Sequence, residues 1–215
     1  MSAPHTPLEP APARLLERLE AGERLQLFLK REDTHELGAF KWRGALPTVA
    51  GYRDAGVTSV VTASTGNHGA AVAWVCRELG LSCTVFGPKD CSEAKLALMR
   101  SQGATITLTG GDLDEAKSAA RIAAEASGAA FFEDGSEPAQ FDGYATIAHE
   151  LLAQLPESDR PPAAVVVPLG NGALLIGIAR ALQAASPETA VVAVVARDAP
   201  VMARSIAARQ AVDEA

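Results

Sequence analysis

The chain has 215 residues, 48% of them hydrophobic, a formal net charge of −7 and a pI near 5.1. This length and apolar content suffice for one full domain or two small ones with a real core. The acidic balance, without any block of basic residues, argues against a nucleic-acid partner, and no apolar run approaches the ~20 residues of a membrane span.

The first part of the chain predicts two helices separated by a strand. Prolines favour an extended start over residues 1–13, which also lacks the charged and apolar regions of a signal peptide. A short helix is expected over residues 14–20, and the apolar run at residues 25–30 predicts a strand. A second helix is expected over residues 41–52, with Pro47 as an interior irregularity.

Strands and helices alternate over the rest of the chain. The expected strands lie at residues 57–63, 82–86, 104–108, 129–133, 163–168 and 191–196. The expected helices lie at residues 68–79, 92–102, 112–127, 142–155, 173–185 and 200–210. This alternation with short glycine turns predicts an α/β fold. The almost continuously apolar strands suit open, mostly parallel sheets covered on both faces, in two three-layer α/β/α units.

The cysteines and histidines give little evidence of a site. Three cysteines show no CxxC spacing, and four histidines do not cluster along the chain. Reduced thiols are therefore expected, which predicts a cytoplasmic protein, and no metal site can be read from these residues.

One lysine stands in an unusually apolar setting. Lys41 lies between Phe40 and Trp42, with a glycine on either side of this segment. Desolvation favours an uncharged amine, which is the form that carbonyl chemistry requires. The alternative is a lysine that extends from the first turn of a helix into solvent.

The turn at residues 62–69, T-A-S-T-G-N-H-G, joins a buried strand to a helix. Ligands in open α/β folds bind beyond the carboxyl ends of strands, and the first N–H groups of a helix favour an anion such as a carboxylate. The alternative is ordinary capping of the helix by Ser64 or Thr65.

A second turn of this kind, P-L-G-N-G-A-L at residues 168–174, also joins a buried strand to a helix. Its two glycines let the backbone surround an anion, which favours a phosphate site. The turn matches neither a Walker loop nor GxGxxG, because Leu175 occupies the place of the third glycine. A simple tight turn is the alternative.

These elements together resemble one family. The A-F-K-W-R-G-A motif at residues 39–45, S-T-G-N-H at residues 64–68 and the glycine loop after V-V-V-P at residues 165–168 follow in the same order and spacing. F-D-G-Y-A-T-I-A-H-E at residues 141–150 resembles the family's G-x-x-T-x-x-x-E pattern. The chain is thus similar, over nearly its whole length, to pyridoxal-phosphate enzymes of the tryptophan synthase β fold type. The nearest branch is that of threonine/serine dehydratases and serine racemases.

The resemblance implies roles for individual residues. Lys41 would be the Schiff-base lysine, Phe40 would flank the ring of pyridoxal 5'-phosphate, and Asn67 would bind its 3'-oxygen. Thr65 occupies the place of a second acid/base serine, which makes Lys41 and Thr65 the catalytic candidates. Backbone groups would bind the substrate carboxylate at Ser64, Thr65, Gly66, Asn67 and His68. Backbone N–H groups would bind the cofactor phosphate at Gly170, Asn171, Gly172, Ala173 and Leu174.

The implied reaction is deamination of a β-hydroxy amino acid, L-threonine or L-serine, to a 2-oxo acid and ammonia through an aminoacrylate. Lys41 would act as the base on the α-proton. Two alternatives stay open. One is a threonine-synthase-like or β-replacement reaction on the same cofactor, because the string from Ser64 to Asn67 resembles that of threonine synthases. The other is a truncated, non-catalytic homologue that acts as an interaction or regulatory chain.

The family pattern continues beyond the length of this chain. The resemblance implies a large cofactor domain from residues 1–52 and 145–215, incomplete at its C-terminal end, and a small α/β domain from residues 53–144. An uncovered apolar sheet face is therefore expected, as is either a homodimer or a partner chain that completes the large domain. Val195 falls where relatives carry a metal-binding glutamate, which predicts no metal there.

Overall fold

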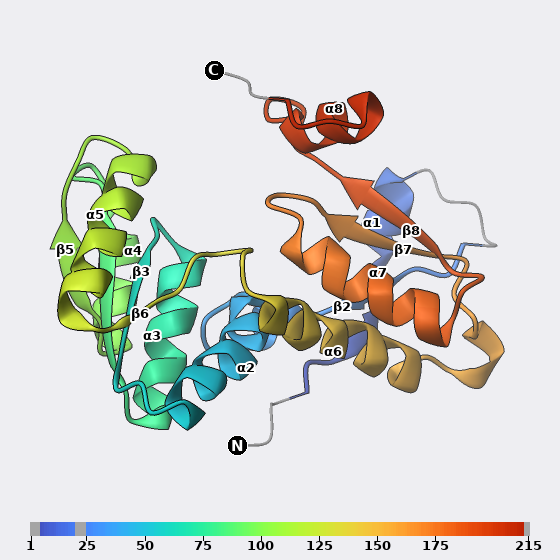
Figure 1. Ribbon diagram of the computed structural model, residues 1–215. Coiled ribbons are helices and arrows are strands. Elements are labelled where there is room, and N and C mark those ends of the chain that lie inside the picture. The colour runs from blue at the N-terminus through green and yellow to red at the C-terminus, as the bar shows by residue number, and fades with distance from the viewer. Residues whose placement is uncertain (1–4, 20–24, 213–215) are drawn as a thin grey trace.

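The computed structural model of the protein describes residues 5–19 and 25–212, which form helices and three sheets arranged in two lobes (Figure 1). The strands are β1 (Leu8–Pro10), β2 (Phe28–Lys30), β3 (Ser59–Ala63), β4 (Ser82–Gly87), β5 (Thr105–Leu108), β6 (Ala130–Phe131), β7 (Ala164–Pro168) and β8 (Ala190–Val194). The helices are α1 (Ala13–Arg18), α2 (Lys41–Asp54), α3 (Asn67–Leu79), α4 (Glu93–Ser101), α5 (Leu113–Ser127), α6 (Pro138–Gln154), α7 (Ala173–Ala185) and α8 (Val201–Ala208), with single 3-10 turns η1 (Glu32–Thr34) and η2 (Glu157–Asp159). Within these described residues, no helix is long and apolar enough to cross a membrane.

The first lobe is a parallel sheet with the strand order β5-β4-β3-β6. Successive residues of β3 point to opposite faces: Val60 packs in one core with α3, and Val61 packs in another with α5. Helices therefore cover both faces of this sheet, which confirms the predicted α/β class. The arrangement places the carboxyl ends of β3 and β6 next to each other.

The second lobe contains a parallel pair, β7 and β8, with α7 on one face. Val167 on that face is buried, whereas Val166, Val192 and Val194 on the other face are 62%, 44% and 49% exposed. Because a sheet normally buries its apolar residues, this lobe presents an uncovered face. The expectation of an incomplete second sheet is thus confirmed.

Several element boundaries differ from those predicted, and two of the differences have a clear physical reason. Residues 8–10, expected to be merely extended, form β1, which pairs antiparallel with β2 at the edge of a small sheet where proline is tolerated. Helix α6 begins at Pro138, four residues before the predicted start, because proline suits the first turn of a helix. Residues 1–4 of the predicted extended segment, and Glu20 of the predicted first helix, lie outside the described residues.

Helices α2, α6 and α7 approach one another at glycines. A Cβ atom on Gly143 of α6 would overlap the carbonyl oxygen of Arg43 in α2, and one on Gly177 of α7 would overlap the carbonyl of Phe141 in α6. Because the backbones touch, no larger side chain fits at either crossing. The glycines thereby fix how α2 sits on α6.

A buried ion cluster binds α2 and α6 to the first residues of the described chain. The Arg43 side chain, in a residue that is 2% exposed, donates to both oxygens of Glu150 at 2.6 and 2.9 Å and to Glu32 at 2.8 Å. Lys30 of β2 donates to Glu150 at 2.6 Å, and the Thr6 hydroxyl donates to Glu32 at 2.6 Å. Burial disfavours the Glu150 carboxylate, but the hydrogen bonds from Arg43 and Lys30 outweigh it and lower its pKa to about 2.

We expect the substitution Gly143→Ala to destabilise the protein by about 1–3 kcal/mol, because the added methyl forces α6 away from α2. Gly51→Ala is the matched control, since a Cβ atom at this site in α2 would meet no atom within 4 Å. It should stabilise the helix by about 0.5–1 kcal/mol. Urea unfolding measures both, and equal midpoints for the two variants would contradict the close contact.

We expect Glu150→Gln to cost about 3 kcal/mol of unfolding free energy, because it leaves Arg43 and Lys30 buried with too little negative charge. Glu125→Gln, on the exposed side of α5, is the control and should change stability by less than about 0.5 kcal/mol. Since folding lowers the pKa of Glu150, its contribution is complete above its usual 4.5 and is lost as the pH falls towards 2. The two variants should therefore converge in stability at low pH.

Candidate active site

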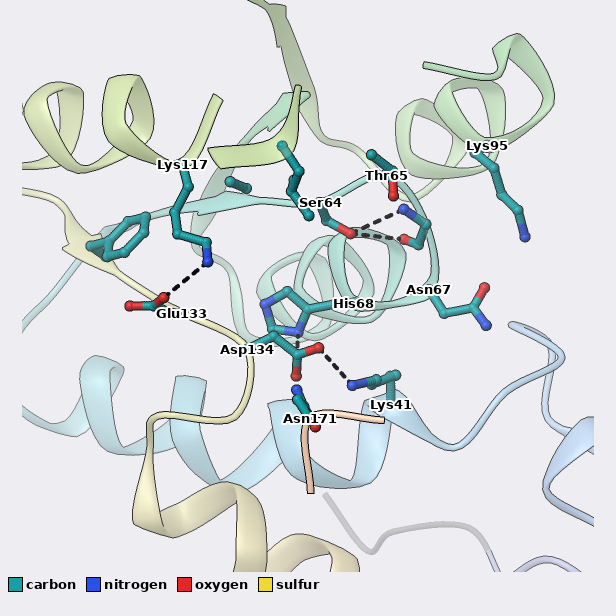
Figure 2. Close-up of a pocket in the computed structure, with 14 residues that line it drawn as sticks. Lys41, Ser64, Thr65, Asn67, His68, Lys95, Lys117, Glu133, Asp134 and Asn171 are labelled. Atoms are coloured by element: carbon teal, nitrogen blue, oxygen red, sulfur yellow. Dashed lines mark hydrogen bonds and ion pairs between the residues drawn. The ribbon is translucent and has the colours of Figure 1, made fainter. Parts of the chain in front are cut away.

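A cavity of about 580 Å³ lies at the carboxyl ends of β3 and β6, between the two lobes (Figure 2). Its lining combines α2, the turn before α3, helices α4 and α5, and the loops that follow β6 and β7. The lining residues are Lys41, Ala63, Ser64, Thr65, Gly66, Asn67, His68, Lys95, Leu113, Lys117, Phe131, Glu133, Asp134 and Asn171. The structure thus brings the predicted lysine and both predicted turns to one place.

Some predicted site residues lie outside this lining. Phe40 packs edge-on against Tyr144 with ring centroids 5.4 Å apart, and the Lys41 Nζ lies 5.5 Å from the centre of the Phe40 ring. In the second turn only Asn171, among the described residues, lines the cavity itself; its neighbours Gly170, Gly172, Ala173 and Leu174 do not.

The turn before α3 does not use ordinary side-chain capping. The N-cap residue is Gly66, which has no side chain to cap the helix, and Ser64 Oγ instead accepts from the Gly66 N–H at 3.0 Å. The capping alternative for Ser64 and Thr65 is therefore wrong. The first N–H groups of α3 remain at the cavity, where they favour an anion.

Lys41, at the first position of α2, forms an ion pair. Its Nζ donates to Asp134 Oδ2 at 2.6 Å, and its side chain is 17% exposed. The sequence predicted an amine among apolar groups only, so the structure differs at this point. The carboxylate comes from the loop after β6, which is distant in sequence and was not identified as part of the site.

Asp134 is itself held in place by neutral and basic groups. Its Oδ1 accepts from Gln140 Nε2 at 3.2 Å, and Gln140 Oε1 accepts from the Gly135 N–H at 2.7 Å. The same Oδ1 lies 3.6 Å from His68 Nδ1. Burial raises the pKa of Asp134, but His68 and Lys41 together outweigh burial and hold this pKa below its usual value.

His68 is buried and its tautomer is fixed by its partners. Its Nε2 lies 3.0 Å from the Thr62 hydroxyl, which donates its one hydrogen to the carbonyl of Phe132 at 2.7 Å. The arrangement that satisfies the Thr62 hydroxyl, the Phe132 carbonyl and His68 together places the hydrogen on Nε2, which donates to Thr62 and leaves Nδ1 facing Asp134. Burial lowers the pKa of His68; Asp134 opposes this effect and Lys41 adds to it.

The loop after β7 meets the loop after β6. Asn171 Oδ1 accepts from the Ala173 N–H at 3.2 Å, and a Cβ atom on Gly135 would lie 2.9 Å from Asn171 Nδ2. Gly172 adopts the left-handed conformation, with φ +94°, at the start of α7, where a residue with a side chain would be strained. This start leaves backbone N–H groups of the first turn of α7 without partners inside the helix.

Comparison with known proteins identifies the protein family of this chain. A family model described as pyridoxal-phosphate dependent enzyme matches residues 5–215. The chain therefore belongs to the family of pyridoxal-phosphate-dependent enzymes, as the sequence motifs predicted.

Individual relatives place the chain within this family. It is 35% identical over 209 residues to an L-threonine ammonia-lyase of Geobacter sulfurreducens, an alignment that covers 92% of this chain and 51% of that protein. It is also 35% identical to the L-threonine dehydratase IlvA of Pasteurella multocida, over 97% of this chain and 39% of that protein. The chain thus spans about half or less of the length of these curated relatives.

Solved structures agree with this placement. The processed form of threonine deaminase isoform 2 from Solanum lycopersicum matches with a TM-score of 0.88 and 29% identity, covering 98% of this chain and 56% of that one. Maize serine racemase matches with a TM-score of 0.89 and 26% identity, covering 98% of this chain and 62% of that one.

The residues around the cavity fit pyridoxal 5'-phosphate, the cofactor of the family. Lys41 supplies an amine, and the starts of α3 and α7 supply N–H groups that favour anions. The backbone is open at Gly66 and Gly170, since a Cβ atom at either would meet no atom within 4 Å. A volume of about 580 Å³ is within the usual range for a small-molecule site.

We expect Thr62→Val to destabilise the protein by about 1–3 kcal/mol, because it leaves the His68 Nε2–H and the Phe132 carbonyl buried without partners. Thr58→Val is the control, since Thr58 is exposed just before the same strand. Thermal unfolding compares the two variants. If both shift the midpoint equally, Thr62 does not hold His68.

Proposed function

We propose that the chain is the cofactor-holding part of a pyridoxal-phosphate-dependent lyase that converts L-threonine or L-serine to a 2-oxo acid and ammonia. The observation that carries this proposal is that Lys41, the 64–68 turn and Asn171 line one cavity, in a chain 35% identical to an L-threonine ammonia-lyase. The cofactor, when bound, supplies an electron sink for the carbon that loses its proton.

In this proposal Lys41 has two tasks. Its amine is the group that holds the cofactor, as a Schiff-base lysine, and after substrate binding it is the base that removes the α-proton. Asp134 lies 2.6 Å from Nζ and would stabilise the ammonium that results. Thr65, exposed in the same cavity, is proposed as a second group that carries a proton.

The two turns have binding roles. Backbone N–H groups at residues 64–68 would bind the substrate carboxylate, and the Asn67 amide would bind the cofactor's 3'-oxygen. Backbone N–H groups at residues 170–174 would bind the phosphate, and Phe40 would flank the ring. Fixing the carboxylate orients the bond to be broken.

A replacement reaction is the second candidate. The S-T-G-N string at residues 64–67 is one observation that favours it. The other is Lys95 of α4, a cation in the cavity lining; Lys117 of α5 also lines the cavity but forms an ion pair with Glu133 at 3.2 Å. A cationic group there suits a substrate whose leaving group is an anion.

The uncovered sheet face bears on the assembly. We propose that residues 1–52 and 145–215 belong to a large domain and residues 53–144 to a small one. Because Val166, Val192 and Val194 are exposed, further chain, from this polypeptide or a partner, or a second copy in a homodimer, would cover them. If no cofactor binds, the chain is instead a non-catalytic homologue that acts as an interaction or regulatory chain. If it is the enzyme, we propose that it acts in the cytoplasm.

We expect the chain with saturating pyridoxal 5'-phosphate to show an absorbance band at about 420 nm, from cofactor bound to a lysine. Lys41→Ala should abolish the band, whereas Lys95→Ala, which removes another lysine of the cavity, should keep it. Release of 2-oxo acid from threonine or serine then distinguishes the lyase from a replacement enzyme. Absence of the band in the unsubstituted chain would exclude both enzymatic proposals for it.

A further inference from the structure

The Asp134 carboxylate is shared by two basic side chains. Its Oδ2 accepts from Lys41 Nζ at 2.6 Å, and its Oδ1 lies 3.6 Å from His68 Nδ1 (Figure 2). Its third neighbour, Gln140, is a neutral amide. One positive charge on either Lys41 or His68 is therefore enough to neutralise the carboxylate.

The geometry fixes where His68 can take up a proton. Nε2 already carries a hydrogen that it donates to Thr62 of β3, so an added proton can enter only at Nδ1, which faces Asp134. The other charged group near His68 is Lys41 of α2, and the His68 ring forms a T-shaped contact with the Phe132 ring, with ring centroids 4.9 Å apart. Lys41 in its ammonium form opposes a second positive charge on His68.

We propose that Asp134 is a positioning residue shared by Lys41 and His68, and that His68 takes up a proton at Nδ1 whenever Lys41 loses its ammonium charge. One proton leaves Nζ and one arrives at Nδ1, so the three groups together stay neutral. The exchange is a property of the protein's own side chains. Only its use in catalysis depends on the function proposed above.

The physical reason is the cost of a buried, unpaired carboxylate. An amine must be uncharged to react with a carbonyl group, so Lys41 has to leave the ammonium form. Asp134, partly buried beside the cavity, would then lack a counter-charge, which is unfavourable. His68 restores the counter-charge on the opposite oxygen of the same carboxylate, which lowers the free-energy cost of producing the reactive amine.

The test is a titration of His68 by nitrogen NMR, on protein labelled with 15N-histidine and carrying no cofactor. The His68 signal is assigned with His68→Gln. In the unsubstituted chain we expect neutral His68 with hydrogen on Nε2. In Lys41→Met the midpoint should rise by at least about one pH unit, which is about tenfold in proton affinity. In Lys41→Met with Asp134→Asn the rise should disappear.

Lys95→Met is the matched control, because it removes a positive charge from the same cavity without contact to Asp134. In this variant the midpoint of the His68 titration should equal that of the unsubstituted chain. Amide spectra verify that each variant is folded, and Lys41→Gln replaces Lys41→Met if the latter is not. An unchanged midpoint in the folded Lys41 variant, or a rise that persists without Asp134, overturns the proposal. Because no cofactor is present, this outcome is independent of the absorbance test.

Discussion

The buried guanidinium of Arg43 determines where the reactive lysine stands. Arg43 lies two residues after Lys41 in α2 and is bound by carboxylates from η1 and from α6. A guanidinium with five donors in a rigid plane tolerates little rotation once both Glu150 oxygens and Glu32 are bound. The helix therefore has one register and one direction, and the first turn, with Lys41, opens at the cavity.

Close backbone contacts at glycines also fix the position of α2, through its packing on α6. At Gly143 and Gly177 the backbones of neighbouring helices touch, so α2, α6 and α7 form a rigid unit. The loop after β6 leads directly into α6, and the loop after β7 leads into α7. The three segments that meet at the cavity are thus positioned by one set of helix contacts, which explains how residues 41, 134 and 171 meet.

Much of this arrangement could be predicted from local sequence. Glycine turns and apolar strands indicated the α/β class, and the lysine motif and both turns were identified before their proximity was known. Asp134 was missed because nothing local marks it: an acidic pair, Glu133 and Asp134, followed by Gly135 is typical of any loop. Its partner Lys41 lies 93 positions away, and the pairing depends on β6 lying beside β3, a strand order that periodicity does not encode.

The valine face of the β7–β8 pair has a consequence for how the chain behaves in isolation. Within the described residues, each of these strands pairs only with the other, so two edges offer free N–H and C=O groups beside exposed Val166 and Val192. Flat, apolar, unpaired edges act as templates for another strand. At high concentration the chain would self-associate through this lobe, while the four-stranded lobe, covered on both faces, stays folded. Solubility and stability would then be governed by different halves of the molecule.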